Sequence, residues 1–418
     1  MKKNNKKGFT IVELVIVIAV IAILAAVLIP TFSSVIKKAN LSNDQQNVRN
    51  MNTALAVEVI PDSKFTTAGD AINGLYREGW NTGKLETYSK GFHYAYSLEN
   101  NRMYLLDETG TVVYPEESVE KSTLWGFYSD NQKDMITGIK KYVALKNITA
   151  KDHFAAAFAE SGYTLDLNGG FIMVDANPNV TANNGVIISG PTEGEGIETG
   201  YQVADQTNCN NQPYTDKVKT IKNKLITAEI NIRHFDHSAD SEYTVKFKNC
   251  IFTDAGCVVG DKDARCKLVF EDCKFINLDG TGWGIVAYAD LEVSNCEFVN
   301  LMGYRGAIQI QSQVNSNVVI SNCTFNGMNI NKNGYGFIRF VVESGIEVSA
   351  NISNNNFASL GRGDCLFAFN NTNLHNETAA GKVTFSNNTV NSSIKTSDYI
   401  GNDMTGDVYY NKFAASIK

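Results

Sequence analysis

The most regular pattern of apolar positions lies at the N-terminus. From Phe9 to Ile29 there are 21 residues, and all are apolar except Thr10 and Glu13. A helix of this length spans the hydrocarbon core of a bilayer. The first seven residues hold four lysines and no acid, which predicts that the N-terminus stays in the cytoplasm and that the rest of the chain lies outside. A signal peptide also begins basic and then turns apolar, but this apolar stretch is longer than its usual core.

A weaker apolar stripe at roughly helical spacing follows the run, at Val35, Leu41, Val48, Met51, Leu55 and Val59. It predicts one long helix that leaves the membrane, is loosened at Pro30 and stops near residues 60–62. The next segments predict a short helix over 66–79 and then a hairpin made by FHYAYS and RMYLLD. Together with TVVYP, they indicate a small α+β head.

The C-terminal half is repetitive. Six hexapeptides recur at spacings of 23, 23, 27, 32 and 33 residues: FKNCIF (247–252), FEDCKF (270–275), VSNCEF (293–298), ISNCTF (320–325), ISNNNF (352–357) and FSNNTV (385–390). A glycine follows about ten residues later in most copies, at Gly256, Gly284, Gly306, Gly336 and Gly363. Repeats of this size, with short strands and a turn-forming Asn or Asp at the third position, are typical of a solenoid.

These repeats predict a right-handed parallel β-helix in which the first, fourth and sixth hexapeptide residues face inward. Equivalent residues then stack about 4.8 Å apart in neighbouring coils. The half resembles the pectate-lyase-like superfamily in fold, which says little about function. TLDLNGGFIM (164–173) is expected to begin the solenoid, after a linker and a capping helix over 121–163. Residues 189–224 show little periodicity and are expected to form a long loop.

A carboxylate inside a membrane segment is costly, so Glu13 needs a partner or a position near the interface. The surrounding sequence, KKGFTIVELVIVIAVIAILAAVLIP, resembles the N-terminal segment of type IV prepilins and pseudopilins. The resemblance implies cleavage by a membrane prepilin peptidase between Gly8 and Phe9, followed by methylation of Phe9. It also implies that Glu13 pairs with the N-terminal amine of a neighbouring subunit. Such a pair specifies register even where desolvation leaves a small net gain.

The eight cysteines support two interpretations. Cys250, Cys273, Cys296 and Cys323 share one repeat position and are expected to form a stack of buried thiols, continued by Asn355 and Asn388. Cys257 and Cys266 flank a turn and are the better candidates for a disulfide. No CxxC pair is present, so neither a zinc site nor any cofactor is expected.

The repeat gives little sign of catalysis. Alternation after the glycine positions directs Gln309, Gln311 and Arg339 outward, which makes them a possible ligand face. No neighbouring coils offer paired acids at matching positions, and no catalytic residue is identified. The net charge of -7 argues against nucleic acid as the main partner.

The sequence therefore predicts a mixed fold in five segments. These are a cleaved leader (1–8), a hydrophobic then amphipathic helix (9–60), a small antiparallel pilin-like head (61–120), a linker with capping helix (121–163) and the β-helix (164–418). The resemblance implies a minor type IV pilin or pseudopilin, membrane-held by one helix and then part of an extracellular filament with other pilin subunits. The β-helix is expected to bind a surface or a glycan. The alternatives are a membrane-attached polysaccharide lyase or hydrolase, and a structural pseudopilin of a secretion or DNA-uptake machine.

Overall fold

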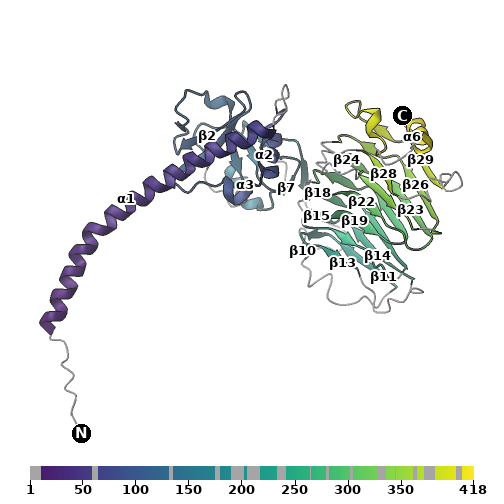
Figure 1. The fold of residues 1–418 in the computed structure, drawn as a ribbon, viewed down its shortest axis with the longest axis horizontal. Coiled ribbons are helices and arrows are strands. Elements are labelled where there is room, and N and C mark those ends of the chain that lie inside the picture. Colours follow the sequence, from purple (N-terminus) through teal and green to yellow (C-terminus); the bar gives the residue numbers. More distant parts are fainter. Residues whose placement is uncertain are drawn as a thin grey trace, which may run out of the picture. The chain divides into compact units, whose positions relative to one another are not determined.

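One helix, α1 (Ile11–Glu58), contains both the apolar run and its amphipathic continuation (Figure 1). Pro30 lies inside this helix and does not end it. The large apolar side chains of its first half are exposed, whereas Val48, Met51 and Leu55 are almost completely buried. The second half of α1 therefore packs on a core, and the first half presents an apolar surface to its surroundings.

The computed structural model describes residues 11–58, 65–130, 135–174, 179–189, 202–204, 217–232, 242–263, 265–278, 282–301, 305–326, 336–343, 345–360, 365–370, 382–401 and 407–418. They divide into two units, one comprising residues up to 145 with 162–166, and the other comprising 146–161 with 167–418.

The first unit joins α1 to a small sheet. Its further elements are α2 (Ala68–Arg77), η1 (Thr82–Leu85), β1 (Phe92–Ser97), β2 (Arg102–Asp107), β3 (Val112–Tyr114), η2 (Lys121–Thr123), β4 (Leu124–Tyr128), β5 (Lys141–Ala144) and β6 (Tyr163–Asp166). The strands of this unit follow one another in the sheet in the order β3-β2-β1-β4-β5-β6. The predicted hairpin is confirmed as β1 and β2, which pair antiparallel. The predicted helix is confirmed as α2, whose Thr67 and Asp70 form a capping box.

The segment 121–163 differs from the expected linker. Its strand β4 pairs antiparallel with β1, and β5 pairs parallel with both β4 and β6. The short sequences LWGFY and KYVA have buried side chains on both faces, so they lack the alternation that marks a half-exposed strand. The helix expected here is present as α3 (Lys151–Ala157) in the second unit, with Phe154 and Phe158 buried.

The second unit is mostly β-structure. Its early strands are β7 (Phe171–Val174), β8 (Val180–Asn183), β9 (Val186–Ser189) and β10 (Gln202–Ala204). The repeats then form β11 (Val218–Lys222), β12 (Lys224–Ile226), β13 (Ile230–Asn231), β14 (Glu242–Lys248), β15 (Ile251–Asp254), β16 (Val258–Val259), β17 (Arg265–Glu271), β18 (Lys274–Leu278), β19 (Trp283–Ala287), β20 (Leu291–Ser294), β21 (Glu297–Val299), β22 (Gly306–Ile310), β23 (Ser316–Ser321), β24 (Thr324–Asn326), β25 (Ile338–Val341), β26 (Val348–Ser353), β27 (Asn356–Phe357), β28 (Phe367–Asn370), β29 (Val383–Ser386) and β30 (Thr389–Val390). The chain continues through η3 (Thr396–Asp398) and α6 (Asp407–Ala415).

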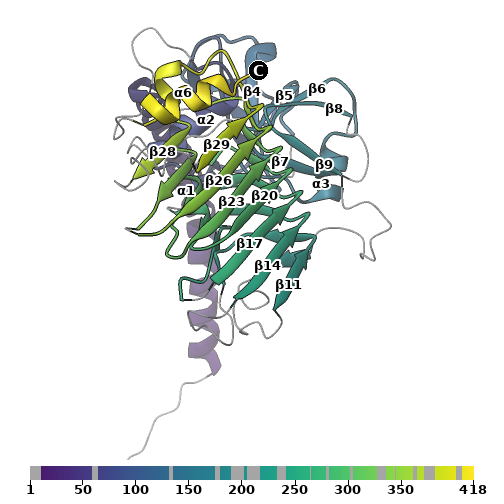
Figure 2. The same ribbon diagram turned by 90° about the vertical axis from the view of Figure 1, so that its right-hand side faces the viewer.

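Each full repeat contributes one strand to each of three parallel sheets. Within the described residues, the sheets run β10-β12-β15-β18-β21-β24-β27-β30, β11-β14-β17-β20-β23-β26-β29, and β13-β16-β19-β22-β25-β28. Figure 2 shows the second of these sheets face-on from β11 to β29, and we call it the middle sheet. Neighbouring strands come from successive repeats, so a large parallel β-region follows the apolar helix.

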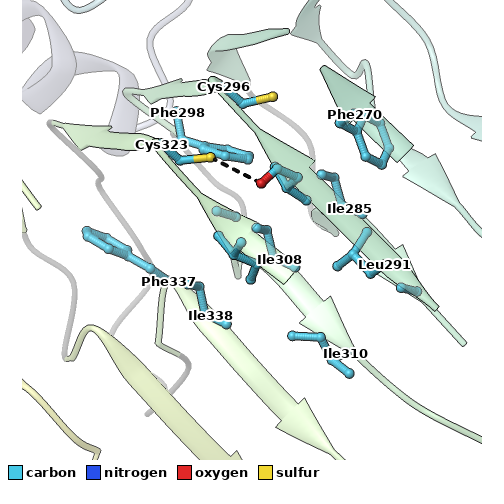
Figure 3. Packing of buried hydrophobic residues seen from close by; sticks show 14 of the residues in the cluster. Phe270, Ile285, Leu291, Cys296, Phe298, Ile308, Ile310, Cys323, Phe337 and Ile338 are labelled. Carbon is cyan, nitrogen blue, oxygen red and sulfur yellow. Dashed lines mark hydrogen bonds between the residues drawn. The ribbon is translucent and has the colours of Figure 1, made fainter. Parts of the chain in front are cut away.

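The hexapeptides join the first two of these sheets. Their first, fourth and sixth residues are buried as predicted, apart from partly buried Phe385 and Val390 in the last copy. The sixth-position rings form a stack: the centroids of Phe275 and Phe298 lie 4.7 Å apart, and those of Phe298 and Phe325 lie 4.9 Å apart. Figure 3 shows part of this core. Stacking of like residues gives successive repeats similar interior packing.

One copy of the repeat lies where the sequence predicted a loop. Residues 217–224, at the end of the expected loop 189–224, contain β11 and the start of β12. Here Ile221–Ile226 occupies the hexapeptide position, and its strands pair in register with β14 and β15. The copy escapes recognition because its fourth residue is Lys224 rather than Cys or Asn.

The third hexapeptide residue makes the turn between the sheets. Asn249, Asp272, Asn295, Asn322, Asn354 and Asn387 all have positive φ, between 50° and 57°. Asparagine and aspartate tolerate this left-handed conformation better than other non-glycine residues do. The amide of Asn249 also donates to Asn223 Oδ1 at 2.7 Å, which links two successive turns.

Candidate functional site

The N-terminal site is centred on Glu13, which lies in the first turn of α1. Its side chain is exposed, and the most apolar 18-residue window of the helix has a mean hydropathy of 3.3 with none of it buried in the structure. A carboxylate in the first turn also interacts favourably with the positive end of the helix dipole. The predicted processing residues Gly8 and Phe9 lie outside the described residues.

Polar side chains fix the second half of α1 to the sheet of the first unit. The carboxylate of Asp44 is fully buried and accepts hydrogen bonds from the backbone N–H groups of Tyr88 and Ser89, both at 2.8 Å, and from the Tyr94 hydroxyl at 3.1 Å. Asn52 accepts from the Met103 N–H at 2.7 Å and donates to the Met103 carbonyl at 3.2 Å. These contacts fix the rotation of the helix, so its exposed half is held in a defined orientation.

The structure brings together the three residues of the predicted ligand face. Gln309 of β22 and Arg339 of β25 are direct partners across the sheet. Arg339 Nη1 donates to Gln309 Oε1 at 3.4 Å, and Gln309 Nε2 donates to Gln311 Oε1 at 2.8 Å. The guanidinium carbon of Arg339 also lies 6.0 Å from the centre of the Trp283 ring. Because Gln309 is only 9 % exposed, much of its hydrogen-bonding capacity serves the sheet itself.

The seven described cysteines are buried thiols, so Cys257 and Cys266 are not joined in a disulfide. The stack is polar as well as space-filling: Cys296 Sγ donates to the Ser294 carbonyl at 3.3 Å, and Cys323 Sγ donates to the Ser321 carbonyl at 3.2 Å. Cys323 also donates to the Val293 carbonyl, the bond drawn in Figure 3. The thiols therefore help to satisfy the turns, which the prediction of apolar fillers did not include.

Asparagine takes over this role at the end of the stack. Asn355 Oδ1 accepts from the Cys323 N–H at 2.9 Å, and Asn388 Oδ1 accepts from the Asn355 N–H at 3.0 Å. No group of three or more His, Cys, Asp or Glu residues in the described part of the chain has an arrangement suited to a metal ion. The described geometry thus supplies an anchor helix and polar sheet faces.

The sequence matches known proteins at the N-terminal region. Residues 3–29 match the prokaryotic N-terminal methylation motif, which covers Gly8, Phe9 and Glu13. The type IV major fimbrial protein FimA of Dichelobacter nodosus is 38 % identical over 72 residues, which are 17 % of this chain and 44 % of FimA. The type IV wide pilus major component PilA4 of Thermus thermophilus is 67 % identical over 37 residues, 9 % of this chain and 28 % of PilA4. The chain thus spans less than half the length of these relatives.

A third relative is matched over most of its length. The prepilin peptidase-dependent protein A of Clostridium perfringens is 32 % identical over 120 residues, which are 24 % of this chain and 84 % of that protein. The chain belongs to the type IV prepilin family. As a prepilin it is anchored in the membrane by α1 before assembly and is extracellular in the pilus afterwards. No solved structure matches the chain.

The prepilin's helix contacts with its head were not identified from the sequence. Asp44 and Asn52 lie among other polar residues of α1, and their polar character alone does not distinguish a buried carboxylate from an exposed one. Asp44 and Asn52 are eight residues apart, and Val48, Met51 and Leu55 lie four, seven and eleven residues after Asp44. These spacings place all five residues on one side of the helix. That shared periodicity is the signal that could have identified them.

Proposed function

We propose that this prepilin is a minor pilin or pseudopilin that carries a right-handed parallel β-helix and uses it to bind a surface or a glycan. A prepilin peptidase would cut between Gly8 and Phe9, and the subunit would then assemble with other pilins through α1. Glu13 would pair with the N-terminal amine of a neighbouring subunit. Its position in the first turn of an exposed apolar helix supports that role.

The observation that carries the proposal is the register of the parallel sheets. Phe247, Phe270 and Val293 are direct partners in one sheet, and Phe252, Phe275 and Phe298 are direct partners in the next. One turn residue with positive φ separates the two sheets in every copy. A chain that adds one strand to each of three sheets per repeat is expected to coil, and parallel crossovers are nearly always right-handed.

The size of the second unit supports a binding role. The Clostridium perfringens relative covers 24 % of this chain, so most of the residues lie beyond the region shared with it. A second unit of this size would obstruct tight lateral packing of the subunits, which favours a role as a minor subunit of the filament. Finding this protein as the main subunit of purified pili would contradict the proposal.

The test of processing is the mass of the N-terminal peptide from the cell surface of the native host. We expect a peptide that begins at methylated Phe9. A Glu13→Gln variant should still be cleaved but should be depleted from filaments, because an uncharged side chain cannot pair with the neighbouring amine. A peptide that begins at Met1 would leave a simple membrane anchor and would remove the assembly role of Glu13.

The binding role of the second unit is tested with the full-length protein in detergent and a panel of immobilised polysaccharides. Retention without release of oligosaccharide supports binding, whereas turnover would assign the protein to the lyases or hydrolases. A fragment that starts near Lys121 is unsuitable, because it would remove the β1 partner of β4. A head that retains no polysaccharide would favour a structural pseudopilin.

A further inference from the structure

The outer face of the middle sheet carries an uninterrupted column of polar side chains. At the end of each strand one residue is the direct partner of the next, and we call this set the outer column: Lys222, Lys248, Glu271, Ser294, Ser321, Ser353 and Ser386. All seven are half-buried or exposed. The preceding residue of each strand faces the core, so the column has a rigid hydrophobic support.

The first three strands of this sheet are strongly basic. β11, β14 and β17 hold six Lys or Arg residues and two Glu residues, a net charge of +4 in a chain whose net charge is -7. β23, β26 and β29 hold no charged residue. β20, between these two groups, holds Glu292, which pairs with Lys267 at 3.0 Å. The strands therefore change from basic to uncharged between β11 and β29, in the stacking order that the labels of Figure 2 follow.

The lysines of the column outnumber the acid that they share. Lys222 lies directly opposite Lys248, an arrangement of like charges that destabilises a sheet. Glu271 forms ion pairs with both Lys246 and Lys248, the latter at 3.6 Å, and its pKa is lowered, mainly by the hydrogen bond from Lys246. One carboxylate thus serves two ammonium groups, and Lys222 has no acidic partner among the described residues. An external anion would relieve this local excess of positive charge.

The serines of the column offer hydrogen-bonding groups at a regular spacing. Within the described residues the hydroxyls of Ser294, Ser321, Ser353 and Ser386 form no hydrogen bond to the protein. Neighbouring strands are about 4.8 Å apart, close to the length of one sugar unit in an extended polysaccharide. A linear polymer that crosses the strands could therefore meet one hydroxyl per coil.

We infer that the outer column binds a linear anionic glycan, whose acidic groups lie at Lys222 and Lys248 and whose sugar hydroxyls lie along the serines. This inference rests on the proposed function and identifies its ligand class and its location. Carboxylate and phosphate groups share the chemistry that the lysines recognise. Single-stranded nucleic acid is disfavoured because neither the column nor the neighbouring one (Thr220, Lys246, Val269, Glu292, Val319, Asn351 and Thr384) holds an aromatic side chain on which bases could stack.

The test measures binding of full-length protein in detergent to four probes: hyaluronan, a linear polysaccharide with phosphodiester links, dextran and single-stranded DNA. We expect wild type to bind hyaluronan, the phosphodiester-linked polysaccharide or both more tightly than dextran and DNA, with affinity that falls as salt rises. The polymer that binds identifies carboxylate or phosphate as the source. Tighter binding of dextran or DNA, or binding that does not respond to salt, would overturn the inference.

Variants locate the site on the sheet. Lys222→Gln with Lys248→Gln should weaken binding about tenfold, and Ser321→Ala with Ser353→Ala should weaken it about threefold. The matched control is Lys274→Gln with Lys382→Gln, which removes two lysines whose partners are Glu297 and Glu347. We expect the control to change affinity less than about twofold, since these lysines lie outside the column.

A gain of affinity separates the inference from a folding defect. Glu271→Gln leaves the lysines without their shared acid, so binding should become about threefold tighter. If wild type binds an anionic glycan but none of the column variants changes its affinity, the column is not the site and the proposed function stands. If wild type binds none of the glycans, both the inference and the glycan-binding role fail.

Discussion

The asparagine at the third hexapeptide position combines two functions in one side chain. Its backbone adopts the left-handed conformation, with φ of 55° at Asn295, and its amide reaches the neighbouring turn, where Asn295 Nδ2 donates to Asp272 Oδ1 at 3.2 Å. Either function alone would allow other residues. Glycine would supply the conformation without the bond, and serine would supply a polar group at a higher conformational cost.

Substitution at Asn295 should separate these two contributions. Asn295→Gly should be nearly neutral, because easier access to positive φ offsets the lost bond, whereas Asn295→Ala should lower the free energy of unfolding by about 1–2 kcal/mol. Urea denaturation of both variants measures the difference. Equal stability of the two would show that backbone conformation does not limit the choice of residue.

The glycine that recurs about ten residues after the hexapeptides is required for a different reason, because there is no space for a side chain. None of the described glycines of this series has positive φ. A Cβ at Gly306 would lie 2.5 Å from the Gly336 carbonyl oxygen and would also meet the Trp283 ring. The backbone of the next repeat cannot move aside as a flexible side chain can, so this position admits no side chain.

Gly306→Ala should therefore destabilise the second unit by about 2–3 kcal/mol through overpacking. Gly282→Ala is the matched control, since a Cβ there would have no atom within 4 Å and the residue does not have positive φ. Thermal unfolding of both variants makes the comparison. A control that unfolds as early as Gly306→Ala would point to a general intolerance of this segment.

Among the elements, α1 has two halves with different partners. The apolar half is exposed, and the polar half is docked through hydrogen bonds as well as by Val48, Met51 and Leu55. Loss of the Asp44 carboxylate would leave two backbone N–H groups and a hydroxyl without their acceptor in a buried place. Burial also raises the pKa of the Tyr94 hydroxyl, which keeps it a donor at all physiological pH values.

Asp44→Ala should lower the free energy of unfolding of the first unit by about 3 kcal/mol, and Asp44→Asn by less, because the amide keeps one acceptor. Asn43→Ala, at an exposed position of the same helix, should change stability by less than about 0.5 kcal/mol. Chemical denaturation in detergent, followed through the tryptophans of this unit, reports the effect. An unchanged midpoint for Asp44→Ala would mean that packing alone docks the helix.

The cysteine stack is an element of another kind, built from one residue of each successive repeat. Its side chains donate to carbonyl groups at the turns, and asparagine replaces cysteine where the stack ends. Thiols at these positions are shielded from solvent, and burial raises the pKa of the Cys296 thiol well above its ordinary value. A thiol with a raised pKa is a poor nucleophile at neutral pH.

Thiol labelling at neutral pH should therefore detect at most Cys209 in the native protein, since the other seven cysteines are buried. After unfolding without reductant, all eight should react. The mass of the labelled protein gives both counts. Six reactive thiols after unfolding would show that one pair is oxidised, and Cys257 with Cys266 would then be examined first.

At the scale of the whole chain, local patterns predicted what depends on strict repetition. The hexapeptide spacing predicted which residues are buried, and the 21-residue apolar run predicted α1. The strands β4 and β5 and the copy at Ile221–Ile226 were missed. β4 and β5 have no polar alternation, and the missed copy has Lys224 where the others have Cys or Asn.

The residues of the candidate sites likewise fall into those that the sequence predicted and those that it did not. Glu13 is conspicuous because its neighbours are apolar, and Gln309 with Arg339 follows from strand alternation. The outer column could not be assembled from the sequence, because its members lie 23 to 33 residues apart and become neighbours only through the register of β11 to β29. Asp44 required knowledge of which helix face meets the sheet.

The equal spacing of the first three hexapeptides has a consequence for how such a chain can change length. Phe247, Phe270 and Val293, the first residues of these three hexapeptides, are direct partners in neighbouring strands. An in-frame duplication of one 23-residue unit would add a coil with its own turn, ring and column residue, and would leave the membrane helix untouched. The reach of this protein beyond the filament could therefore grow in steps of one strand spacing, by copying its own gene segments and without inventing a new fold.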